Sequence, residues 1–215
     1  MKTIRNLAAL FAIPAVFAAG WTLIKTLLSF ASVKNQDYIP FWIGILCYIV
    51  FQVLFYKPLL TYVFGHELTH AIAGILSGAR IKKFKVGKRS GSVVLDKDNI
   101  WITLSPYFVP LYSFIVIFLY FMLGWQIDIR PLYSYFLFFL GFSIAFHIAL
   151  TIYVLGIGQP DLKVYGVFFS MTTILIINII VFSLLLILSF PHEISPSALF
   201  QAHFQNIKTM YTMIF

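Results

Sequence analysis

The chain has 215 residues, of which 61% are hydrophobic and 10% charged, and its net charge is +8. Its mean hydropathy is +0.94. It is therefore far more apolar than a soluble domain, which is about half apolar and a quarter charged. No water-soluble fold of this length can bury so much apolar surface, so the sequence predicts an integral membrane protein solvated by the lipid bilayer. No stretch is polar enough to form a second domain, and we therefore predict a single membrane domain over residues 1–215. The lone cysteine, Cys47, excludes an internal disulfide.

Five apolar runs are long enough to cross about 30 Å of hydrocarbon, for which a helix needs roughly 20 residues. In chain order they cover residues 7–30, 38–78, 100–125, 131–155 and 164–190. The first run follows Lys2 and Arg5 as a signal peptide would, but it is longer than the apolar part of a signal. We therefore predict an uncleaved helix there.

The second run is about twice the length that one crossing needs, and Lys57-Pro58 interrupts it. Split at that point it gives two short spans, and unsplit it gives one long, kinked or partly re-entrant element. The sequence thus predicts an all-α polytopic membrane protein with five to six transmembrane helices, and it leaves the number open.

A basic segment follows this run at residues 80–98, where seven of the fifteen basic residues are opposed only by Asp96 and Asp98. Basic loops between spans stay in the cytoplasm, so we predict that residues 80–97 are cytoplasmic in a multi-pass protein. If the chain crosses the membrane twice before the loop, Lys2 and Arg5 also lie on the cytoplasmic side. The sequence does not decide on which side the N-terminus lies. The loop is suited to anionic lipid. Nucleic-acid binding is not predicted, because no soluble domain presents the charge.

Two other segments show a regular pattern. Residues 81–86 and 92–95 are short β-like runs on either side of Arg89-Ser90-Gly91, which predicts a short β-hairpin-like cytoplasmic insertion, with a plain basic loop as the alternative. In the tail, residues 191–215, Leu199, His203, Ile207 and Met210 recur at helical spacing. That spacing predicts an amphipathic helix on the membrane surface.

The strongest chemical signal is an HExxH pattern, His66-Glu67-Leu68-Thr69-His70, inside an apolar run. Helical residues four apart share a face, so both imidazoles can reach one metal ion, and Glu67 can stand beside the ion and accept a proton from water. Zinc lowers the pKa of such a water to about 7 and polarises a scissile carbonyl. Inserting a charged residue at the centre of a membrane span costs roughly 2.5–3.5 kcal/mol on insertion scales. Such residues are therefore expected where they bind a ligand or an ion. The alternative is a polar cluster that packs helices together.

A catalytic zinc site needs a third protein ligand and an open position. Asp161 follows Gln159-Pro160 just beyond one span, and His147 lies within that span. Fourteen helical residues cover about 21 Å, so only one of the two is expected to reach the metal. Asp161 could instead pair with Lys163 or cap a helix, and His147 could bond a neighbouring helix. Less suited residues lie in the joints and the tail: Asp37, Asp128, His192, Glu193 and His203.

These motifs resemble the site-2 protease family of intramembrane zinc metallopeptidases. HExxH in a span, a basic β-like loop after it and Pro160-Asp161 near the end of a later span carry the resemblance, which covers residues 58–170 as a metalloprotease core. Ser105-Pro106-Tyr107 also resembles a polar, proline-containing stretch of that family. The resemblance implies a core of three spans, His66, His70 and Asp161 as zinc ligands, and Glu67 as general base. The family's aspartate is usually followed by glycine, whereas Leu162 follows Asp161 here.

The resemblance implies that the protein is an enzyme, a zinc metalloendopeptidase that hydrolyses peptide bonds in or near the membrane-spanning segments of protein substrates. A substrate helix must unwind before water can attack it, and its extended strand could then pair with the predicted hairpin. Two other functions stay open: a non-catalytic membrane protein with a structural zinc site, and an ion transporter. A membrane metalloprotease with glutamate as third ligand is a nearer rival, but besides Glu67 the chain offers it only Glu193. The substrate and the oligomeric state are not predicted.

Overall fold

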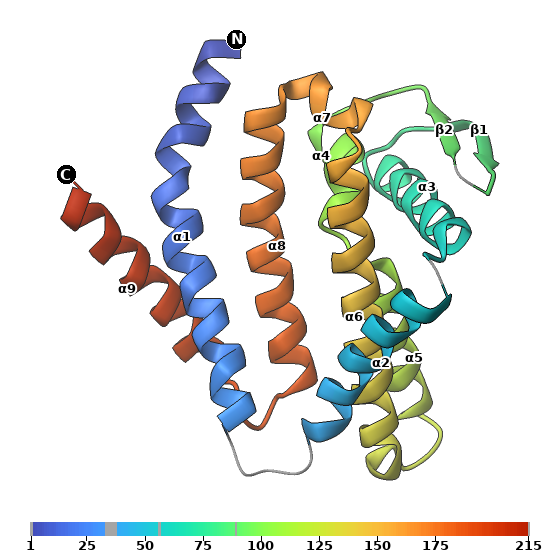
Figure 1. The fold of residues 1–215 in the computed structure, drawn as a ribbon, viewed down its shortest axis with the longest axis vertical. Coiled ribbons are helices and arrows are strands. Elements are labelled where there is room, and N and C mark those ends of the chain that lie inside the picture. The colour runs from blue at the N-terminus through green and yellow to red at the C-terminus, as the bar shows by residue number, and fades with distance from the viewer. Residues whose placement is uncertain (1, 33–37, 56, 89, 215) are drawn as a thin grey trace. The chain divides into compact units, whose positions relative to one another are not determined.

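A computed structural model describes residues 2–32, 38–55, 57–88 and 90–214 (Figure 1). Its elements in chain order are α1 (Lys2–Ser32), α2 (Ile39–Phe55), α3 (Leu59–Leu76), β1 (Ile81–Val86), β2 (Gly91–Leu95), α4 (Ile100–Leu104), the 3₁₀ turn η2 (Ser105–Tyr107), α5 (Leu111–Leu123), the 3₁₀ turn η3 (Arg130–Leu132), α6 (Tyr133–Gly156), α7 (Pro160–Tyr165), α8 (Val167–Ser189) and α9 (Pro196–Ile214). The predicted all-α class is confirmed, with one small two-stranded sheet among the described residues.

Within the part of the chain that the structure describes, three helices are long and apolar enough to cross a membrane: Lys2–Ser29, Arg130–Gly156 and Val167–Ser189. A fourth crossing is possible if the bent pair Ile100–Tyr107 and Leu111–Leu123 counts as one span. Large apolar side chains such as Val53 and Leu76, 78% and 83% exposed, lie on the outside of their helices, where lipid would cover them. These features fit a membrane protein. Five or six crossings stay a prediction, because α2 and α3 are not candidate spans by length and composition.

The chain divides into two compact units, which are described separately. One consists of Met1–Lys34 with Pro160–Phe215, and the other of Asn35–Gln159. We call them the terminal unit and the central unit. The predicted long run over residues 38–78 belongs to the central unit and forms two helices, α2 and α3, on either side of Lys57-Pro58.

The run over residues 100–125 was predicted as one span, and that prediction was wrong in its shape. It forms α4, η2 and α5, with a bend of 80° between the two apolar parts. Pro106 and Pro110 lack the N–H group that a continuous helix needs, which explains the break. Asn99 fixes where α4 begins, because its side chain accepts a hydrogen bond of 2.9 Å from the Ile102 N–H.

The predicted hairpin is confirmed. β1 and β2 pair antiparallel from Ile81 opposite Leu95 to Val86 opposite Gly91, with an irregularity near Ile81. Arg89 of the predicted turn lies outside the described residues. The hairpin folds onto α3, since a Cβ added at Gly74 of α3 would lie 2.7 Å from the Leu95 side chain.

Two glycines allow α2 and α6 to pack backbone to backbone. A Cβ added at Gly141 would lie 2.1 Å from the Phe41 carbonyl oxygen, and one added at Gly44 would lie 2.1 Å from the Phe138 carbonyl oxygen. Small residues play this part where membrane helices approach closely. The close approach places α6 firmly within the central unit.

We expect Gly141→Ala to destabilise the central unit by about 1–3 kcal/mol, the usual cost of overpacking. The added methyl group meets rigid backbone, which cannot rotate away as a side chain can. Gly156→Ala on the same helix is the matched control, because a Cβ there has nothing within 4 Å. Thermal unfolding in detergent should show a lower Tm for Gly141→Ala and an unchanged or higher Tm for Gly156→Ala. Equal Tm values would contradict the packing argument.

The terminal unit contains α1, α7, α8 and α9 (Figure 1). The predicted tail helix is present as α9, and its Leu199 and His203 are buried. Asn206 donates a hydrogen bond of 2.7 Å to the hydroxyl of Thr22 in α1. Part of the apolar stripe is therefore used for packing within the unit, and its predicted contact with the membrane surface stays a prediction.

Candidate metal centre

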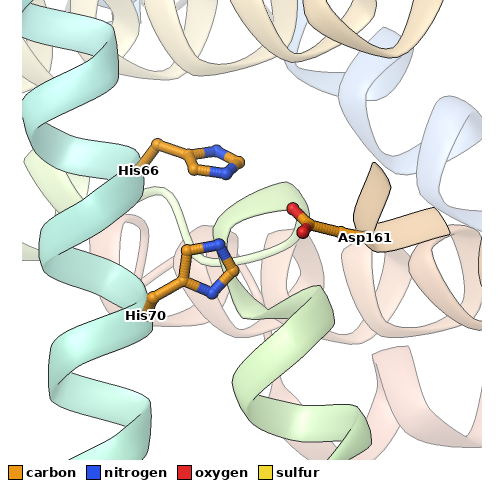
Figure 2. Close-up of side chains that lie close together, drawn as sticks. All are labelled: His66, His70 and Asp161. Atoms are coloured by element: carbon orange, nitrogen blue, oxygen red, sulfur yellow. The ribbon is translucent and has the colours of Figure 1, made fainter. Parts of the chain in front are cut away.

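Helix α3 carries the HExxH residues on a regular helical turn. His66 and His70 project from the same side of α3, as the spacing of four residues predicts (Figure 2). Their ring centroids lie 4.8 Å apart and their planes are inclined by 81°. The imidazoles therefore converge and do not diverge, which is the first requirement for a shared ligand.

The tautomer of His70 follows from its hydrogen bond. Nδ1 of His70 lies 2.7 Å from the carbonyl oxygen of Ile102. A carbonyl can only accept, so Nδ1 carries the proton and Nε2 keeps its lone pair for a metal ion. Metal-binding histidines usually have their second nitrogen bonded in this way. Ile102 lies in α4, whose start is fixed by the Asn99 cap.

Two aromatic rings enclose His66. Tyr107 of η2 is fully buried and stands edge-on to His66, with ring centroids 5.2 Å apart and planes inclined by 82°. The centroid of Tyr62, one turn earlier in α3, lies 5.8 Å from that of His66. The two rings therefore limit the movement of the His66 imidazole. The sequence marked the stretch around Tyr107 only through a resemblance.

Glu67 is buried, with 8% of its surface exposed, and the first residue of β2 lies directly against it. A Cβ added at Gly91 would lie 2.5 Å from Cγ and 2.8 Å from Oε1 of Glu67. With any residue larger than glycine at this position, either the carboxylate or β2 would have to move. The hairpin thus covers Glu67, a contact that the sequence analysis missed.

Asp161 completes the one group of three or more potential metal ligands among the described residues. His66, His70 and Asp161 could hold a metal ion, since one ligand atom from each lies within 4.8 Å of the others (Figure 2). Asp161 lies in the first turn of α7, in the terminal unit, whereas the histidines lie in the central unit. His147, the other predicted third ligand, does not belong to the group.

The donor set suits zinc. Two imidazole nitrogens and a carboxylate oxygen are the kind and number of protein ligands that a catalytic zinc site would use. The hydrogen bond from His70 to Ile102 supports the fit independently, because it leaves the lone pair of Nε2 available.

The remaining acidic candidates are placed elsewhere. Asp128 forms an exposed ion pair of 2.8 Å with Arg130. Hydrogen bonds from the Arg130 side chain and backbone hold the pKa of Asp128 below its usual value. Glu193 is exposed between α8 and α9. Asp37 lies outside the described residues.

The remaining histidines are also accounted for. His203 of α9 is buried in the terminal unit, where its Nε2 lies 3.0 Å from the Ser183 hydroxyl. Burial lowers the pKa of His203. His192 is exposed between α8 and α9. His147 is buried in α6 of the central unit.

No protein-family model, no curated protein and no solved structure matches this chain. The resemblance to site-2 proteases therefore rests on the motifs alone.

Proposed function

We propose that the protein is an intramembrane zinc metallopeptidase that hydrolyses peptide bonds in or near the membrane-spanning segments of protein substrates. The observation that carries the proposal is the pair of converging imidazoles on α3 next to a buried carboxylate. A packing cluster would not need His70 to be held in the metal-binding tautomer by Ile102. A structural zinc site has four protein ligands, whereas the group among the described residues offers three, as a catalytic site does.

In this proposal His66 and His70 bind the zinc ion through nitrogen, and Asp161 binds it through a carboxylate oxygen. When bound, zinc lowers the pKa of a coordinated water and polarises the carbonyl of the scissile peptide. The ligand group supports Asp161 over His147 as the third ligand. Asp161 adds a negative charge that two neutral imidazoles cannot supply.

Glu67 acts as the general base. It accepts a proton from the attacking water and can then deliver that proton to the leaving amine. Burial under Gly91 shields the Glu67 carboxylate from bulk solvent. The carboxylate would therefore exchange protons with the attacking water and the leaving amine.

The hairpin gives the proposal a place for the substrate. A membrane helix satisfies its own amides, so the segment to be cut must become extended before attack. β1 is exposed along most of its length and belongs to a sheet of two strands among the described residues, so a free edge is available for an added strand. β2 contacts Glu67 through Gly91, which would bring a strand paired to the hairpin near the base. We further propose that this basic hairpin is cytoplasmic.

The test is a zinc and cleavage assay on the full chain purified in detergent. We expect about one zinc per chain and chelator-sensitive cleavage of a reporter with a single membrane span. His70→Ala should lose the zinc and reduce cleavage to background, because one ligand is removed. His192→Ala is the matched control, since His192 is exposed outside the site, and it should keep both.

Three outcomes would reject the peptidase. Zinc that remains in His70→Ala would show that the metal binds elsewhere. A zinc-loaded chain that cleaves no membrane reporter would favour the structural site. Zinc flux into proteoliposomes that depends on His66 and His70, without cleavage, would favour the transporter.

A further inference from the structure

The hairpin lies beside α3 (Figure 1) and turns one of its two faces toward that helix. Phe84 of β1 stands edge-on to Phe64 of α3, with ring centroids 6.5 Å apart and planes inclined by 83°. Phe84 is opposite Val93 in the sheet, and β2 meets α3 through Gly91 and Leu95 on the same side. Because side chains alternate along a strand, the residues between these point to the opposite face.

That opposite face, which we call the outer face, carries Lys83 and Lys85 of β1. In the register of the sheet they lie opposite Val94 and Ser92, and all four side chains are exposed. Neither lysine forms an ion pair with a carboxylate among the residues that the structure describes. The outer face therefore presents two ammonium groups on one strand, two residues apart.

The acidic residues nearest to these lysines in the sequence bond elsewhere. Asp96 accepts a hydrogen bond of 2.7 Å from the backbone N–H of Arg80. Asp98 accepts one of 2.7 Å from the hydroxyl of Thr103 in α4. The positive charge of the outer face is thus available to a partner from outside the hairpin.

A strand that pairs with the edge of β1 brings specific side chains to the outer face. Every second residue of the added strand points to this face, with its Cβ about 4.5–5.5 Å from that of the neighbour directly across. Opposite charges at such positions attract and like charges repel. Since Lys83 and Lys85 are two residues apart, the matching carboxylates are also two residues apart, as in Glu-x-Glu. Carboxylates three residues apart point to opposite faces, so only one can lie beside a lysine.

We propose that the outer face of the hairpin selects substrates in which two acidic residues, separated by one residue, lie in the extended segment next to the cleaved span. Lys83 and Lys85 are the specificity-determining residues, and the edge of β1 supplies the main-chain hydrogen bonds. This inference rests on the proposed function and names the class of substrate.

The location proposed for the hairpin makes this preference selective. Flanks of membrane spans on the cytoplasmic side are mostly basic. Two lysines on the binding face repel such flanks, and repulsion of wrong partners is a common source of specificity. An anionic lipid headgroup has the same charge as a carboxylate, but it uses neither the strand edge nor a spacing between residues.

The test measures binding to the full chain in detergent, with Glu67→Gln so that no turnover is needed. The probes are fluorescent single-span peptides that differ only in the flank of the span. One carries two glutamates separated by one residue, one carries two glutamates separated by two residues, and one carries two lysines separated by one residue. The first should bind about two- to five-fold tighter than the second, because it forms one more exposed charge pair, and the lysine probe should bind weakest.

Charge reversal identifies the residues responsible. Lys83→Glu with Lys85→Glu should reverse the order, so that the probe with two lysines binds tightest. Lys82→Glu with Lys88→Glu is the matched control, because it makes the same change in net charge at two exposed lysines that have no partner in the register of the sheet. The control should keep the parental order. If the reversed variant fails to unfold cooperatively, Lys83→Gln with Lys85→Gln replaces it and should bind all three probes equally.

Three results would overturn the proposal. Equal affinity of the parent for the two glutamate spacings would show that no strand register is read. An equal reversal in the Lys82 and Lys88 control, or a preference that survives in the glutamine variant, would show that the outer face is not responsible. Equal affinities, with a Tm that anionic lipid raises in the parent but not in the Lys83 and Lys85 variant, would assign these lysines to lipid headgroups.

The failure of this inference is distinguishable from that of the proposed function, because binding is measured without turnover. A chain that shows the spacing preference but never cleaves a membrane reporter keeps the binding face and rejects the peptidase. A chain that cleaves reporters of both spacings, and binds them equally, keeps the peptidase and rejects the role of Lys83 and Lys85.

Discussion

Replacing Glu67 by glutamine should abolish peptide hydrolysis while zinc stays bound. The amide has nearly the same shape as the carboxylate but cannot accept a proton at neutral pH, so only the general-base step is removed. Loss of a positioned acid–base group typically costs about 10²- to 10⁴-fold in rate. Because Glu67 is outside the ligand group, zinc content and zinc affinity should match those of the parent. The measurement is zinc content and cleavage of a single-span reporter on the same preparation.

Glu193→Gln provides the control for this experiment. It makes the same chemical change at an exposed carboxylate between α8 and α9, so rate and zinc content should both be unchanged. Parental cleavage rates in Glu67→Gln would remove the enzymatic interpretation of the HExxH motif. Loss of zinc in Glu67→Gln would instead make Glu67 a ligand, which would reject its assignment as base.

The features that follow from residue spacing could be predicted. His66 and His70 share a face because of helical geometry alone, and the structure places their rings 4.8 Å apart. The hairpin followed from two β-like runs and a turn between them. The residues alone left Asp161 and His147 as alternative third ligands, and the family resemblance implied Asp161. Asp161 belongs to a group that could hold a metal ion, and its role as a ligand stays a prediction.

The remaining features depend on contacts that leave no pattern in the sequence. The 80° bend within residues 100–123 was missed, because the apolar run predicted a crossing and the effect of Pro106 and Pro110 was not weighed. The hydrogen bond between His70 and the Ile102 carbonyl could not be predicted either, because backbone groups carry no residue-specific signal. Glycine at position 91 suggested only a turn, although its part is a close approach to Glu67.

We expect Gly91→Ala to lower the turnover of the proposed enzyme about 100-fold without loss of zinc. The new Cβ would lie 2.5 Å from Cγ of Glu67, so either the carboxylate or β2 must move. A misplacement of about 1 Å in a catalytic group can cost 100-fold in rate. Gly91 is not among the described glycines with positive φ, so alanine is tolerated by the backbone and the effect belongs to the added methyl group. Turnover at saturating substrate and zinc content are the quantities to measure.

Gly87→Ala separates this contact from a general disturbance of the hairpin. It adds the same methyl group just after β1, where the Cβ meets the Ser90 carbonyl at 3.0 Å and is not near Glu67. If burial under Gly91 positions the base, turnover falls much further in Gly91→Ala than in Gly87→Ala. Equal losses would mean that hairpin integrity, and not the placement of Glu67, sets the rate.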